Sequence, residues 1–160
     1  MDARGPLNAD VRCHLAFAVE DPVTNFLAMR TKYYDPLCRQ LGLQFERTSS
    51  STATGYAVVS GAVGPVRVFF ECDRGVHAFS LGFADDESDF CGIEAIADRF
   101  PRVRHTSLGQ QRLSLEEQAA FLRQHWRAIQ DMFSSASAAE LRAWRAARGE
   151  AYTKKMSGDT

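Results

Sequence analysis

The sequence predicts one domain of the α+β class, an antiparallel meander sheet of at least four strands packed by N-terminal and C-terminal helices. The chain has 160 residues, the usual size of a single domain, and 45% of them are hydrophobic. Segments of alternating apolar and polar residues follow one another between residues 43 and 83, with helical patterns on either side. We therefore expect residues 1–160 to form one domain, with frayed tips at residues 1–10 and 157–160.

The first predicted helix spans residues 22–41, between an Asp-Pro start signal and a C-cap glycine. Pro36 lies inside this pattern, where it removes a backbone donor and disfavours helical geometry at the preceding residue. We expect two short helices or one kinked helix, with the irregularity near Tyr34 and Asp35. The earlier apolar run at residues 11–19 is compatible with either a strand or a helix.

The sheet is predicted from the change to a period of two after residue 42. The Ser/Thr-rich residues 48–54 are expected to form a loop, and Gly61 is expected to end the second strand. Asp73-Arg74-Gly75 supplies a tight reversal before the last strand. Connections this short cannot hold crossover helices, so the strands should be antiparallel. The four predicted strands cover residues 43–48, 55–60, 66–72 and 76–83.

Three helices are predicted after the sheet. The first covers residues 93–100, with apolar residues on one face, and stops at Pro101. The second opens with the capping-box pattern Ser114-Leu115-Glu116-Glu117 and continues to residue 133. The third repeats that pattern at residues 137–140 and continues to residue 152.

Charge and cysteine usage narrow the class of protein. Nineteen lysines and arginines against twenty aspartates and glutamates leave a net charge of −1, so we do not expect a nucleic-acid-binding protein. The four cysteines form no CxxC pair, and no signal-peptide pattern is present, which favours a reducing cytoplasm. The apolar runs are far shorter than the ~18 residues of a membrane span.

Residues that could carry chemistry do not combine into a catalytic set. Cys72 lies near His77, and Cys91 near His105, but neither pair has a third group to orient the histidine. Buried structural cysteines are the simpler interpretation. The glycines form no phosphate-binding motif, and the acidic residues 85–89 lack the spacing of a calcium loop. We therefore expect no catalytic residue, no metal and no cofactor.

The order of elements resembles small bacterial α+β immunity proteins encoded beside secreted polymorphic toxins. The resemblance covers residues 24–133 and depends on the helix end Leu41-Gly42-Leu43, the hairpin over residues 66–82 and the helix that opens at Ser114. The helix from Ser137 is an addition to that layout. The resemblance implies a small cytoplasmic protein that occludes the active site of a toxin. Secretion chaperones, usually homodimeric and more acidic, have a similar layout, and a small enzyme of unidentified type is the third alternative.

The interface is predicted at the clustered carboxylates between the last strand and the next helix. Four acidic side chains in five residues repel one another, and lysine or arginine from a partner would relieve that repulsion. Such a loop suits a basic protein partner, for example a nuclease toxin. The predicted partner-binding residues are Asp85, Asp86, Glu87 and Asp89.

Overall fold

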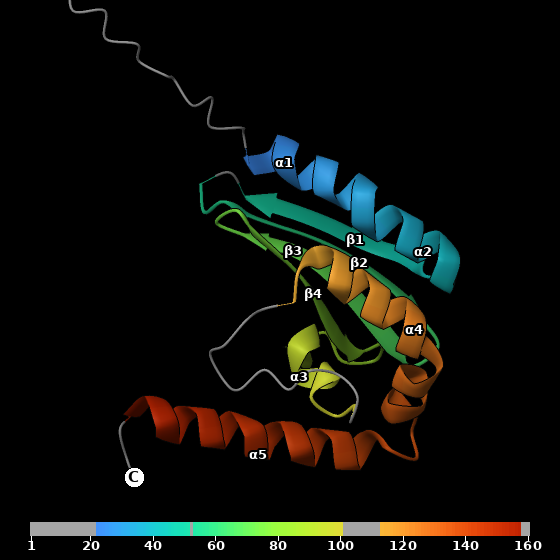
Figure 1. The fold of residues 1–160 in the computed structure, drawn as a ribbon, viewed down its shortest axis with the longest axis vertical. Coiled ribbons are helices and arrows are strands. Elements are labelled where there is room, and N and C mark those ends of the chain that lie inside the picture. Colours follow the sequence, from blue (N-terminus) through green and yellow to red (C-terminus); the bar gives the residue numbers. More distant parts are fainter. Residues whose placement is uncertain (1–21, 52, 101–112, 158–160) are drawn as a thin grey trace, which may run out of the picture.

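A computed structural model describes residues 22–51, 53–100 and 113–157, which form a five-stranded antiparallel sheet with helices on one face (Figure 1). The strands are neighbours in chain order from β1 to β5, and therefore the predicted α+β meander is confirmed. The expectations for residues 1–10, 11–19 and 158–160 lie outside the described residues, whereas residue 157, which was expected in the frayed tip, is the end of the last helix.

The first helical segment is continuous but changes its pitch in the middle. The amide of Asp35 donates to the carbonyl of Arg30, five residues earlier, which makes one widened π-helical turn immediately before Pro36. The irregularity predicted near Tyr34 and Asp35 is therefore present as this turn. Gly42 caps the segment with a φ of 71°, as predicted. The segment consists of α1 (Pro22–Met29), η1 (Arg30–Tyr34) and α2 (Asp35–Leu41).

Two strands are longer than the sequence predicted. The first continues through residues predicted as a loop, to Ser51, and the second passes Gly61 and ends at Val63. A Cβ at Gly61 would lie 2.9 Å from the Gln44 carbonyl oxygen and from the Tyr34 hydroxyl, so this glycine permits close packing rather than ending a strand. The long strands are β1 (Gln44–Ser51), β2 (Tyr56–Val63), β3 (Val66–Asp73) and β4 (Val76–Phe83).

The turn between β3 and β4 has the predicted conformation. Asp73 pairs with Val76, and the two residues between them, Arg74 and Gly75, have φ values of 49° and 82°. Two successive positive φ values are typical of the type I′ turn, whose twist matches that of a β-hairpin.

A fifth strand and a short helix follow the acidic loop. β5 (Phe90–Gly92) pairs with Ser80 to Gly82 of β4, and the sequence analysis did not predict it. The helix α3 (Ile93–Ala97) ends three residues before the predicted residue 100. Three residues are too few to show a period, which is why β5 was missed.

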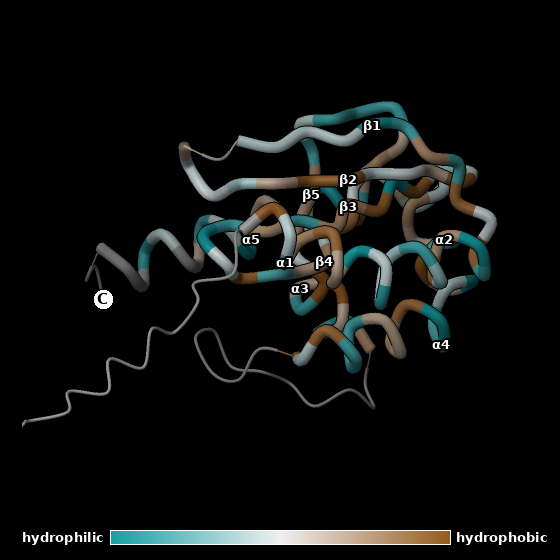
Figure 2. Tube along the Cα trace, turned by 90° about the horizontal axis from the view of Figure 1, so that it is seen from above, coloured by the Kyte–Doolittle hydropathy of each residue, from teal (hydrophilic) through white to brown (hydrophobic). Residues whose placement is uncertain are grey.

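The helices α1, α2 and α4 (Leu115–Phe133) cover one face of the sheet, whereas β1 and β2 lie on the opposite side of the molecule in Figure 2. Ser114 caps α4 with the predicted capping box. The buried side chain of Gln118 accepts a hydrogen bond of 2.8 Å from the amide of Phe79, which fixes α4 to β4. Alternate residues of β3 face these helices in the core, namely Val66, Val68, Phe70 and Cys72.

The last helix, α5 (Ala138–Ser157), lies across the end of the sheet near α3 (Figure 1). Leu141 is its buried anchor, with Trp144 packed partly against the core. No helix among residues 22–51, 53–100 and 113–157 is long and apolar enough to cross a bilayer.

Candidate partner-binding surface

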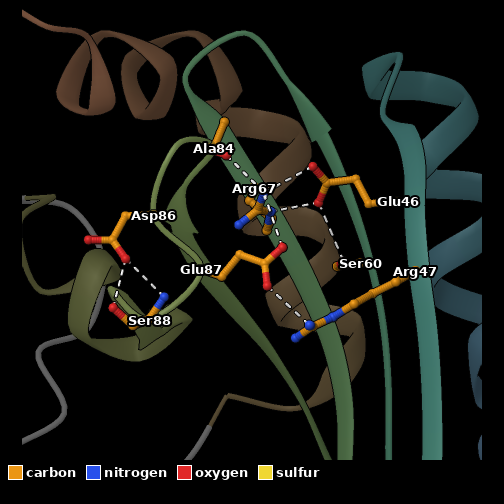
Figure 3. Close-up of polar contacts among 8 residues, drawn as sticks. All are labelled: Glu46, Arg47, Ser60, Arg67, Ala84, Asp86, Glu87 and Ser88. Atoms are coloured by element: carbon orange, nitrogen blue, oxygen red, sulfur yellow. Dashed lines mark hydrogen bonds and ion pairs between the residues drawn. The ribbon is translucent and has the colours of Figure 1, made fainter.

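The structure places the four predicted carboxylates together on the loop between β4 and β5. The side chains of Asp85 and Glu87 are 84% and 62% exposed, respectively, whereas that of Asp89 is 25% exposed. Asp86 accepts hydrogen bonds of 2.9 and 2.7 Å from the amide and hydroxyl of Ser88, and these bonds lower the pKa of its carboxyl (Figure 3). The loop therefore presents two exposed carboxylates, Asp85 and Glu87, a half-buried Asp86 and an Asp89 that is largely covered.

Arginines from distant parts of the chain neutralise much of this loop. Glu87 lies 3.1 Å from the Arg47 guanidinium, and Asp89 contacts both Arg142, at 3.2 Å, and Arg145 of α5. From the sequence alone, the four carboxylates were expected to repel one another until a partner arrives. That premise needs correction, because the fold itself supplies cations to the loop.

Glu87 reaches from the loop to a charged cluster on the sheet face that the helices leave uncovered (Figure 3). At its centre the Arg67 guanidinium donates to both carboxylate oxygens of Glu46, at 2.6 and 3.1 Å, and to the carbonyl of Ala84 at 2.8 Å. The Arg67 side chain is only 8% exposed, and its Nη1 has no hydrogen-bond partner within the described part of the chain. A bidentate pair of this kind holds the guanidinium in one orientation.

The same sheet face carries apolar side chains that reach solvent. The strand register places Tyr56, Val76 and Phe90 on the face of Arg67, and these are three of the five large hydrophobic side chains exposed among the described residues. The ring of Phe90 lies 5.2 Å from that of buried Phe69. We name this side of the sheet, defined by Tyr56, Arg67, Phe69, Glu71, Val76 and Phe90, the open face.

Glu71 and Tyr56 are neighbours on the open face. The Ser80 hydroxyl donates a short hydrogen bond to the Glu71 carboxylate, which is partly buried. Burial, and secondarily the Glu71 charge, raise the pKa of Tyr56, so its phenol stays protonated at neutral pH. No role was predicted for these two residues from the sequence, although the alternation of side chains along a strand is the signal that could have identified them.

On the other side of the loop, a cavity of about 730 Å³ lies between α5 and the β5–α3 segment. Trp144 lines it, with the guanidinium groups of Arg99 and Arg148 at 5.2 and 5.7 Å from its ring. Cys91 also lines it, but burial raises the pKa of this thiol to about 11. The thiolate is therefore scarce at neutral pH, which argues against a nucleophilic role.

The first Cys–His pair of the sequence analysis lies in the core. Cys72 and His77 are register partners on β3 and β4, and the His77 ring is 5.9 Å from that of Phe70. Burial lowers the pKa of His77, which favours its neutral form. The surroundings fit the structural interpretation of Cys72. His105, the predicted neighbour of Cys91, lies outside the described residues.

In the portion of the chain that the structure describes, no group of three or more His, Cys, Asp or Glu side chains could hold a metal ion. Comparison with protein families, curated proteins and solved structures finds no match. The function has to be inferred from the surface itself.

Proposed function

We propose that the chain is a non-enzymatic binding protein whose interface combines the open face with the acidic loop. The observation that carries this proposal is the sheet face that the helices leave uncovered, where exposed Tyr56 and Phe90 lie on the same side as the oriented guanidinium of Arg67. Aromatic residues and arginine dominate the binding energy of protein interfaces. Apolar side chains exposed together on one face are typical of interaction sites.

The partner we propose is a basic toxin domain, and the chain would act as its cytoplasmic immunity protein. The carboxylates of Asp85, Asp86 and Glu87 support a basic partner, because they can attract it over distance before contact. The resemblance in layout supports the toxin class. Binding over the toxin's active site would neutralise it without any chemical step on this chain.

The test uses the protein encoded in the reading frame beside this one. Co-expression should protect cells from that protein if it is a toxin, and the purified pair should associate at a rate that falls as salt is added. The informative variant carries three substitutions and leaves the Asp89 contacts with α5 in place. It is Asp85→Asn, Asp86→Asn and Glu87→Gln.

This triple variant should associate roughly tenfold more slowly at low salt and should show a flatter salt dependence. The matched control removes three exposed carboxylates of the long helices α4 and α5, through Glu116→Gln, Asp131→Asn and Glu150→Gln. Equal rates for wild type and triple variant would refute the loop as the interface. A stable complex with an exported protein that is not toxic would instead favour the secretion chaperone, and a homodimer in solution would agree with it.

A further inference from the structure

We propose that Glu71 and Tyr56 form a receptor on the open face for one lysine or arginine side chain of a protein partner. This inference rests on the proposed function, because it assumes that the open face is the interface, and it adds the chemistry of one contact. It also adds a second acidic position, on the sheet itself, to the acidic loop that the sequence predicted.

Glu71 differs from the other carboxylates of this face in its charge balance. Each of the others has an arginine within 4 Å, in the pairs Glu46–Arg67, Glu87–Arg47 and Asp73–Arg74. Glu71 has no ion pair with any lysine or arginine in the described residues, and its carboxylate contacts the hydroxyls of Ser80 and Tyr56. A partly buried carboxylate without a cation is a charge that a partner can neutralise.

The surroundings of Glu71 suit a long cationic side chain. The Ser80 hydroxyl orients the carboxylate, as a preformed acceptor requires. Val76, which is 49% exposed and lies on the same face as Tyr56, provides an apolar surface for the methylene groups of the incoming side chain. Tyr56 is 37% exposed, and its ring can take the cation on its face. Because the phenol stays neutral, Tyr56 adds no second negative charge.

The surroundings of Glu71 favour a polypeptide as the partner rather than a free small cation. The acceptor lies on a strand surface that also carries exposed apolar side chains, where a protein can bury area around one cation. The exposed carboxylate of Glu87 on the same face favours a basic surface. A free small cation would gain none of that apolar contact. The site therefore binds a lysine or arginine side chain that belongs to a folded protein surface or to an extended segment.

The experiment uses a hexalysine peptide as the probe and follows backbone amide resonances of the full chain by NMR. The wild type should show its largest shift changes at Glu71, Tyr56 and their register partners. Glu71→Gln keeps an acceptor for Ser80, and it should weaken peptide binding roughly fivefold. The control Glu116→Gln removes an exposed carboxylate from α4 and should bind as the wild type does.

A second variant keeps the test decisive if Glu71→Gln disturbs the sheet. Tyr56→Ala removes the exposed ring and should also weaken the peptide, whereas Tyr56→Phe should retain most of the affinity. Shifts confined to residues 85–89 and unchanged by Glu71→Gln would overturn the receptor while leaving the acidic loop as the interface. Absence of shifts anywhere, or equal weakening by Glu116→Gln, would overturn the receptor and also count against a basic partner.

Discussion

The pair of Arg67 with Glu46 should stabilise the open face more than any exposed ion pair does. Two guanidinium nitrogens of Arg67 contact the Glu46 carboxylate, at 2.6 and 3.1 Å, and the two side chains are 8% and 31% exposed. Breaking a fully buried pair costs about 3–5 kcal/mol, and exposed pairs contribute about 0–1 kcal/mol. The partial exposure of Glu46 puts the expected coupling energy between these limits, at about 1–2 kcal/mol.

A double-mutant cycle of Arg67→Met and Glu46→Gln measures this coupling from urea unfolding of the four proteins. The matched control is the Asp73–Arg74 pair, whose arginine is 82% exposed, and its coupling should stay below about 0.5 kcal/mol. The two cycles differ mainly in burial. Equal coupling energies in both cycles, or a value below about 0.5 kcal/mol for Arg67 and Glu46, would refute the assignment of Arg67 as the organising residue of the cluster.

Three further predictions concern the core and the last helix. Burial lowers the pKa of His77 below its ordinary value of 6.5, so the stability of the wild type should fall as the pH drops from 6.5 towards the folded pKa. His77→Leu should remove this part of the pH dependence, and parallel profiles of Tm against pH for the two proteins would contradict the prediction. Gly61→Ala places a Cβ 2.9 Å from a β1 carbonyl oxygen and should lower the free energy of unfolding, measured in urea, by about 1–3 kcal/mol. The control Gly149→Ala, whose Cβ would have nothing within 4 Å, should be neutral or raise that free energy by up to about 1 kcal/mol. A smaller loss at Gly61 than at Gly149 would contradict the close packing around Gly61. Asp89→Asn removes the carboxylate shared by two arginines of α5, and it should raise the rate of backbone amide hydrogen exchange in α5 roughly tenfold without affecting β3. Unchanged exchange rates in α5 would mean that apolar contacts alone hold the helix.

The parts of the fold that local chemistry determines could be predicted from the sequence. The Arg74-Gly75 turn and the Ser114 capping box each depend on a few adjacent residues, and both occur where the sequence placed them. The long helix α4 was also predicted with its observed end, because its apolar periodicity continues without interruption.

The missed elements depend on pairing between distant residues. The second half of β1 consists of serine and threonine, which local patterns assign to a loop, but pairing with β2 extends the strand to Ser51. β5 exists because the edge of β4 is available for pairing, and nothing in its three residues signals a strand. Secondary structure that tertiary pairing imposes cannot be read from composition.

The ion pairs of the candidate site also depend on residues that are distant in the sequence, so they could not be predicted from it. The acidic loop was visible in the sequence, but the arginines that bind it are 40 and 53 residues away at Arg47 and Arg142, on opposite sides of the loop. One side of the loop thus belongs to the open face and the other secures α5. Charge removal there should have two separable consequences. Loss of Glu87 would free cations at the proposed interface, whereas loss of Asp89 would loosen α5. A partner that attracts the exposed carboxylates would compete with Arg47 for Glu87, and its affinity would therefore include the cost of breaking that contact.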